Sequence, residues 1–121
     1  DPEENDEEDD GTIEIRCTSG PCAGNIYTIG KGDEVVIGRD PAEAHIVIES
    51  LEVSRKHALI SVEGRLVHAP RVLDLGSTNG TFLVEDDGKT VDPVGSKRKI
   101  WWGWQKLILG KGPEAMVFER F

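Results

Sequence analysis

From Gly11 onward the sequence is a series of short segments rich in valine and isoleucine, separated by glycine, proline, aspartate or asparagine. Several of these segments alternate apolar and polar side chains, as a half-buried strand does. Ile13 and Ile15, for example, alternate with Glu14 and Arg16. No segment shows a helical apolar stripe over about 11 residues. We therefore predict strands in TIEIRCT, NIYTI, EVVIGR, HIVIE, ALISVE, RLVHA, RVLDL, TFLVE, KTVDPV, QKLILG and AMVFERF.

About eleven short strands at regular spacing, with 14 glycines and six prolines to form turns, are typical of a β-sandwich. The 121 residues are enough for one domain with a core and too few for two. We predict an all-β, two-sheet sandwich. Its function should lie in loops at one end, because strands supply rigidity and loops carry binding groups.

The acidity of the chain is concentrated at its start. The first ten residues, DPEENDEEDD, hold eight of the 23 acidic side chains and no basic one, although the net charge of the whole chain is −9. The remaining residues carry 15 acidic and 14 basic side chains. A block of like charges has nothing apolar to bury. We predict an acidic disordered tail or linker over residues 1–11 and one domain over residues 12–121.

Two cysteines, Cys17 and Cys22, are too few for a structural zinc site, which needs about four ligands. We expect reduced thiols beside a strand end, with a local bridge across the turn as the alternative. Reduced thiols fit an intracellular protein, in the cytoplasm, the nucleus or an organelle. No apolar run approaches the roughly 20 residues that span a bilayer, so no membrane partner is expected. We expect no metal and no cofactor.

Three predicted loops carry unusual chemistry. They contain Gly38 and Arg39, then Ser54 with His57 three residues later, then Asn79 and Gly80 within DLGSTNGT. In this order, spacing and all-β context, the motifs resemble the forkhead-associated (FHA) domain family over residues 12–121. The resemblance implies an FHA/SMAD-like sandwich and a non-catalytic module that binds phosphothreonine-containing segments. The resemblance also implies that phosphothreonine is bound in preference to phosphoserine, because a small niche receives the methyl group of threonine.

The resemblance assigns phosphate contacts to Arg39, Ser54, Arg55 and Thr78, and a contact with the peptide backbone to Asn79. These residue types suit the task, because a phosphate ester needs a bidentate cation and several neutral donors. Taken singly, each has a plainer interpretation: Arg39 as a surface arginine, Ser54 as a turn residue, and Asn79 in a hairpin turn.

Three further residues are expected to be structural. Gly38 is expected to allow a close backbone approach, and Gly80 to shape its loop. In the family, the histidine at the position of His57 braces the loops through its ring hydrogen bonds, so we expect neither a ligand nor a general base there.

Ligand choice in the family often depends on the third residue after the phosphothreonine, read by the loop that here contains Leu51 and Glu52. Glu52 should disfavour an acidic residue at that ligand position by like-charge repulsion. Leu51 would instead favour an apolar one.

The C-terminal part departs from the family pattern. Trp101, Trp102 and Trp104 follow the basic run of residues 97–99. This segment resembles the corresponding hairpin of the FHA domain of plant kinase-associated protein phosphatase. One interpretation is that Trp102 or Trp104 fills the sandwich edge beside a solvated basic loop. The other is a second contact surface.

The sequence thus predicts a module for phosphorylation-dependent protein interaction in signalling, monomeric and part of a larger protein. Its partner would be a kinase substrate or an autophosphorylated kinase, and nucleic acid is not expected. An enzyme built on Ser54, His57 and Asp74 is disfavoured, because no GxSxG elbow or oxyanion loop is present. The alternative function is an FHA-like scaffold that binds an unphosphorylated partner through a sheet face or the Trp101–Trp104 segment.

Overall fold

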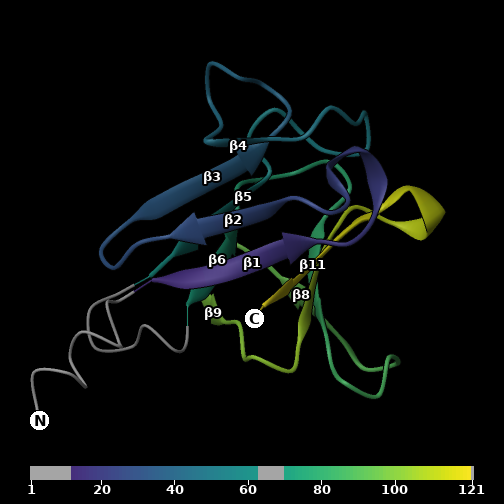
Figure 1. Cartoon of the computed structure of the whole chain (residues 1–121). Coiled ribbons are helices and arrows are strands. Elements are labelled where there is room, and N and C mark those ends of the chain that lie inside the picture. Colours follow the sequence, from purple (N-terminus) through teal and green to yellow (C-terminus); the bar gives the residue numbers. More distant parts are fainter. Residues whose placement is uncertain (1–11, 63–69, 121) are drawn as a thin grey trace, which may run out of the picture.

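The computed structural model describes residues 12–62 and 70–120 and consists of two packed β-sheets (Figure 1). The six-stranded sheet has the order β2-β1-β11-β10-β7-β8, and the five-stranded sheet has the order β4-β3-β5-β6-β9. All pairs are antiparallel except the parallel pair β3–β4. The strands are β1 Ile13–Cys17, β2 Ile26–Ile29, β3 Glu34–Gly38, β4 Ile46–Val47, β5 Ala58–Ser61, β6 Arg71–Asp74, β7 Thr81–Val84, β8 Val91–Val94, β9 Lys99–Ile100, β10 Lys106–Leu109 and β11 Met116–Arg120.

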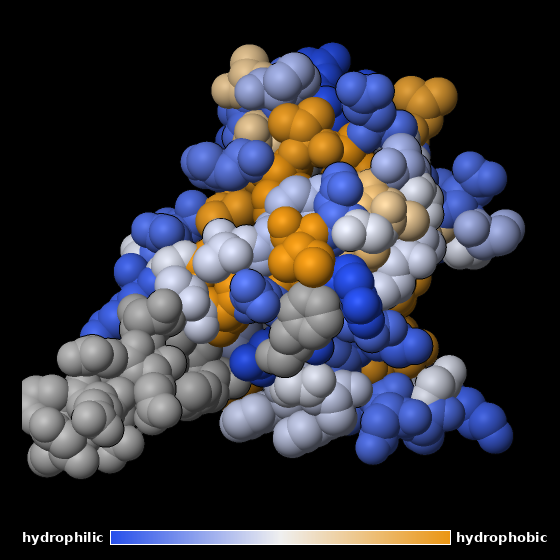
Figure 2. Space-filling model, viewed as in Figure 1, coloured by the Kyte–Doolittle hydropathy of each residue, from blue (hydrophilic) through white to orange (hydrophobic). Residues whose placement is uncertain are grey.

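The core lies between the inner faces of the two sheets. In β1 the buried side chains of Ile13, Ile15 and Cys17 alternate with exposed ones, as the sequence pattern predicts. Phe118 of β11 and Trp101 are the largest fully buried side chains. On the face drawn in Figure 2, hydrophobic residues gather around β2 to β4 and hydrophilic residues predominate at the periphery. The predicted all-β sandwich is therefore confirmed.

The predicted strand segments agree closely with the observed strands. The predicted segment RLVHA lies outside the described residues, and each of the other segments contains a strand. Strand β9 was not predicted, because its two residues lie at the end of a basic run, are too few to show alternation, and pair with β6. Residues 12–62 and 70–120 contain no candidate for a membrane-spanning helix.

The expectation of reduced thiols is wrong: Cys17 and Cys22 form a disulfide, with a Cα–Cα distance of 5.8 Å. A short 3₁₀ turn, η1 (Gly20–Cys22), begins with Gly20 at a φ of +79° and returns the chain towards the end of β1. Both cysteine side chains consequently point into the core side by side. The prediction of an intracellular location loses the support that it drew from free thiols.

The tryptophan segment also differs from expectation, because the buried residue is Trp101 and not Trp102 or Trp104. Its indole Nε1 donates to the Gln105 carbonyl at 2.8 Å, so its one polar group is satisfied inside the core. Trp102 and Trp104 remain 42% and 56% exposed and stack on each other, with ring centroids 5.5 Å apart.

Candidate functional site

Two of the predicted loops meet at one end of the sandwich, where β3 ends and β5 begins. The backbone N–H of Arg39 donates to the Ser54 carbonyl at 3.0 Å, and that of Asp40 donates to the Arg55 carbonyl at 3.3 Å. The loop after β3 therefore lies directly against the loop before β5. This contact places the Arg39 and Ser54 motifs together, although 14 residues separate them in the sequence.

Gly38 permits this contact. A β-carbon at residue 38 would lie 1.9 Å from the Arg55 carbonyl oxygen and 3.2 Å from the Lys56 α-carbon. Both neighbours are backbone atoms, which cannot move aside as a flexible side chain can. Any residue other than glycine would push the Arg39 loop away from the Ser54 loop.

The guanidinium of Arg39 is held in place by one of its nitrogens. Its Nε donates to the Val53 carbonyl at 3.1 Å, and the side chain is half-buried. Among the ion pairs between described residues, none involves Arg39. The two terminal nitrogens therefore form a positioned cationic fork, the arrangement that suits bidentate binding of a phosphate.

Ser54 joins the third loop to the other two. Its hydroxyl oxygen accepts a hydrogen bond from the Thr78 backbone N–H at 3.0 Å, which leaves the hydroxyl proton to be donated elsewhere. Thr78 is exposed, and so is Arg55. The structure thus brings Arg39, Ser54 and Thr78 to one place, with Arg55 on the exposed side of the same loop.

His57 is fully buried and connects two of the loops through its ring. Its Nδ1 accepts from the Ser54 backbone N–H at 3.0 Å, and its Nε2 donates to the Gly80 carbonyl at 2.7 Å. These partners require a neutral ring with the proton on Nε2. Burial is the main cause that lowers the pKa of His57, against smaller opposite effects from the Gly80 carbonyl and nearby carboxylates.

The same bonds argue against a Ser-His-Asp catalytic set. Both ring nitrogens of His57 are occupied by backbone groups, and the Ser54 hydroxyl pairs with Thr78. Asp74 pairs with Ser77 and Thr81. Within the described residues, the three side chains are not arranged for proton transfer.

Asp74 organises the loop between β6 and β7, and the sequence reasoning did not assign it this role. Its carboxylate accepts from the hydroxyls of Ser77 and Thr81 at 2.6 Å and from the N–H groups of Gly76 and Ser77 at 3.0 Å. Burial alone would raise the pKa of Asp74, but these donors outweigh it and lower the pKa. The motif D-x-G-S is a recognisable signal, because aspartate often accepts N–H groups two and three residues later.

Gly80 ends this loop with a φ of +92°, a conformation that disfavours other residues. Its N–H donates to the Ser77 hydroxyl, and its carbonyl accepts from His57 and from the Gly110 N–H. Gly80 therefore links the loop to His57 below it and to the end of β10.

The Asn79 side chain points towards the loop before β5, where its Nδ2 donates to the Glu52 carbonyl at 3.0 Å. The Glu52 carboxylate in turn accepts from the Lys111 backbone N–H at 2.8 Å. Glu52 thus faces the β10–β11 hairpin, whereas Leu51 is 88% exposed. The structure brings the two predicted specificity residues to the same end of the molecule but directs them differently.

Comparisons with known proteins agree on one family. The family model described as the FHA domain matches residues 35–103. The FHA domain of the CT664 protein from Chlamydia trachomatis has a TM-score of 0.70 at 21% identity, covering 91% of this chain and 98% of that one. An FHA domain from Arabidopsis thaliana has a TM-score of 0.74 at 20% identity, covering 90% and 83%.

A third similar structure comes from work on phosphothreonine-dependent FHA domain interactions. It has a TM-score of 0.65 at 23% identity, and the match covers 89% of this chain and 95% of that one. A search of curated protein sequences found no match.

Proposed function

The chain belongs to the FHA domain family, and on that basis we propose that it binds a phosphothreonine-containing segment of another protein. The partner would be a kinase substrate or an autophosphorylated kinase. The domain would then read a phosphorylation mark in signalling, with no catalytic step of its own.

One observation carries this proposal: three loops place a positioned guanidinium next to two hydroxyl-bearing residues. Arg39 offers its terminal nitrogens, while Ser54 and Thr78 offer a hydroxyl each. A phosphate ester carries about −1.5 to −2 charge and three acceptor oxygens, which need a cation and several neutral donors. Arg55 adds an exposed cation beside them.

Asn79 is proposed to contact the peptide backbone. Its amide nitrogen donates one hydrogen bond to the Glu52 carbonyl, and its amide oxygen accepts none from the described residues. That oxygen is suited to accept an N–H from an extended ligand. The phosphothreonine-dependent interactions of the related domain support this type of ligand.

The test is binding of a phosphothreonine peptide library and its unphosphorylated copy, measured by fluorescence anisotropy. We expect phosphate-dependent binding, weakened about tenfold to a hundredfold by Arg39→Ala, since a hydrogen bond to a charged group contributes about 1.5–3 kcal/mol. Arg16→Ala is the matched control, because Arg16 lies on β1 in an exposed pair with Glu119. It should bind like the wild-type protein.

Equal binding with and without phosphate would contradict the proposal. It would favour the scaffold function instead, with the exposed, stacked pair of Trp102 and Trp104 as the contact surface. Circular dichroism of the Arg39→Ala protein checks that a loss of binding is not a loss of folding.

A further inference from the structure

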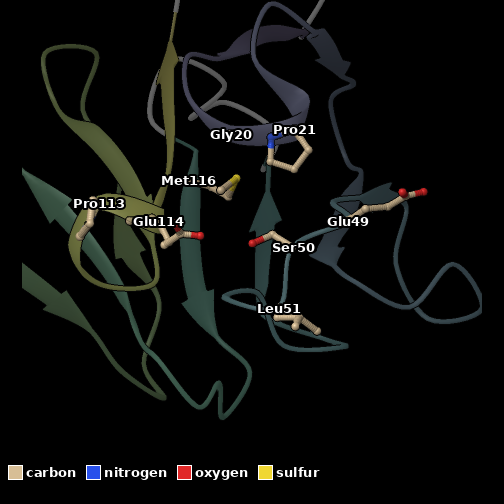
Figure 3. A pocket seen from close by; sticks show the side chains of 9 residues that line it. Gly20, Pro21, Glu49, Ser50, Leu51, Pro113, Glu114 and Met116 are labelled. Carbon is tan, nitrogen blue, oxygen red and sulfur yellow. The ribbon is translucent and has the colours of Figure 1, made fainter.

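We call Arg39, Ser54 and Thr78 the phosphate cluster, and the end of the sandwich that carries them the ligand end. A groove lies at this end, outside the phosphate cluster. It has a volume of about 380 Å³ and runs between the β4–β5 loop, the disulfide-closed turn η1 and the β10–β11 hairpin. We call it the hairpin groove and define it by Pro21, Ser50, Leu51, Pro113, Glu114 and Met116 (Figure 3). If the chain binds a phosphothreonine segment, as proposed above, this groove is close enough in the fold to receive a neighbouring side chain.

The walls of the groove combine apolar and polar side chains, and the apolar ones come from three separate segments. Pro21 comes from η1, Pro113 from the hairpin and Leu51 from the β4–β5 loop, while Met116 is nearly buried. Leu51 is the most exposed of the large hydrophobic residues described. A ligand that covers it would remove apolar surface from water, which favours an occupant with a hydrocarbon stem.

The polar groups in the groove point to a cation. Figure 3 shows the Glu114 carboxylate and the Ser50 hydroxyl directed towards each other across the groove, whereas Glu49 points away. The Ser50 hydroxyl oxygen accepts the Glu52 N–H at 3.2 Å. Among the ion pairs between described residues, none involves Glu114. Its carboxylate can therefore accept a charged donor from a ligand.

The segments that form the groove are tied to one another by bonds within the domain. The disulfide between Cys17 and Cys22 closes η1, and the Ser19 hydroxyl ties this turn to the hairpin. That hydroxyl donates to the Ala115 carbonyl at 2.9 Å and accepts the Val117 N–H at 3.0 Å. Glu52 fixes the other side through the Lys111 N–H. A preformed site loses little entropy when a side chain enters it.

Charge changes sign across the ligand end. The β4–β5 loop carries Glu52 before Ser54, and Arg55 and Lys56 just after it. Glu114 adds to the acidic side. A ligand with a phosphate over Arg39 and a positive charge over the groove would match both signs, whereas the reverse placement would be repelled.

We propose that the hairpin groove binds an arginine or lysine side chain near the phosphothreonine of the same ligand. The aliphatic stem would pack between Leu51, Pro21 and Pro113, and the charged end would pair with Glu114. This specificity differs from a preference for a plain apolar residue, because it depends on a carboxylate of the hairpin.

The experiment uses phosphothreonine peptides with alanine elsewhere, in which one arginine, leucine or aspartate is moved through the flanking positions. Affinities are measured by anisotropy for the wild-type chain, for Glu114→Gln and for Glu14→Gln. Glu14 is an exposed carboxylate on β1, so Glu14→Gln makes the same change of charge away from the groove.

At one position we expect arginine to bind about fivefold more tightly than alanine, the upper range for one partly exposed ion pair. Aspartate should bind more weakly than alanine there. Glu114→Gln should remove most of the arginine gain and leave the all-alanine phosphopeptide unchanged, while Glu14→Gln should keep the gain. Amide shifts of Leu51, Glu114 and Met116 should differ between the arginine and alanine peptides.

Two results overturn this inference alone. One is leucine binding at least as tightly as arginine at every position; the other is an arginine gain that Glu114→Gln leaves intact. The all-alanine phosphopeptide is also compared with its unphosphorylated copy. This comparison tests the proposed phosphate-dependent binding independently of the arginine preference. If no peptide binds in a phosphate-dependent way, the proposed function fails, and the inference fails with it.

Discussion

At the scale of single residues, the ligand end is organised by groups that would not touch a ligand. His57 connects Ser54 to Gly80, and Asp74 gathers four donors of its own loop. These bonds hold Ser54 and Thr78 in position. The positions of the residues proposed to bind phosphate therefore depend on the hydrogen bonds of His57 and Asp74.

Gly38→Ala should lower both the stability of the domain and its phosphopeptide affinity. The new β-carbon would overlap the Arg55 carbonyl, and we expect a loss of about 1–3 kcal/mol in the free energy of unfolding. Urea denaturation measures it. Gly95→Ala is the control, because a β-carbon there meets nothing within 4 Å. Similar losses in both variants would contradict this explanation.

Stability should depend on pH through His57. Because the native pKa of His57 lies below the ordinary value of 6.5, the unfolded chain binds a proton first as the pH falls. The free energy of unfolding should be unaffected by this group above about pH 6.5 and should decrease below it. Asp74, whose pKa is lowered, should stabilise the fold above its ordinary pKa and lose this effect in stronger acid.

Urea denaturation of the unliganded chain between pH 5 and 8 measures this effect without the titration of the phosphate itself. Nuclear magnetic resonance of the His57 ring is the second readout and should show a neutral ring protonated on Nε2. A ring that is charged at pH 7 would contradict the hydrogen-bond assignment.

At the scale of elements, the turn after β1 and the β10–β11 hairpin behave as one unit. Ser19 bonds to the backbone of Ala115 and Val117, and a β-carbon at Gly20 would lie 2.3 Å from the Met116 side chain. Figure 1 shows this turn (purple) beside the hairpin (yellow). The disulfide closes the turn from within, so it supports an element pair that is distant in the sequence.

Replacing both Cys17 and Cys22 with alanine should lower the free energy of unfolding by about 2 kcal/mol, the chain-entropy value for so short a loop. Phosphate-dependent binding should persist, because Arg39 and Ser54 lie on other loops. Thermal unfolding of the wild-type chain with and without a reductant gives an independent measurement. No change under reduction would show that the bridge does not contribute to stability.

At the scale of the whole molecule, the two ends of the sandwich differ in chemistry. One end carries the phosphate cluster and the hairpin groove. Trp102 and Trp104 lie after β9, where the Trp104 indole donates to Glu85 beyond the end of β7. Most of the excess negative charge belongs to the first ten residues, since the rest of the chain is nearly neutral.

Removal of residues 1–10 should therefore raise phosphopeptide affinity at low ionic strength. Eight carboxylates repel an anionic ligand at long range, and salt screens this repulsion within about 10 Å at 0.1 M. Anisotropy titrations at several salt concentrations should show the two proteins converging as salt increases. A difference that persists at high salt would point to a direct contact of the acidic segment instead.

Two features could be predicted from the sequence alone: the all-β class of the fold and the residues of the three loops. Alternation in β1 and the glycine-bounded segments specify strands, because a period of two buries one face. The Arg39, Ser54 and Asn79 motifs are local patterns, which can be recognised without knowing how the chain packs. Such signals are short-range, so a single sequence contains them in full.

The contacts between distant groups could not be predicted, because they follow from the packing of the two sheets. The pairing of β9 with β6 and the burial of Trp101 instead of its neighbours depend on long-range contacts. The disulfide joins cysteines only five residues apart, but Ser19 of the turn that it closes bonds to the distant Ala115 and Val117. The groove formed by Leu51, η1 and the hairpin brings together residues as far apart in the sequence as Pro21 and Met116. Patterns among neighbouring residues do not predict such contacts, because these contacts form only once both sheets have packed around a common core.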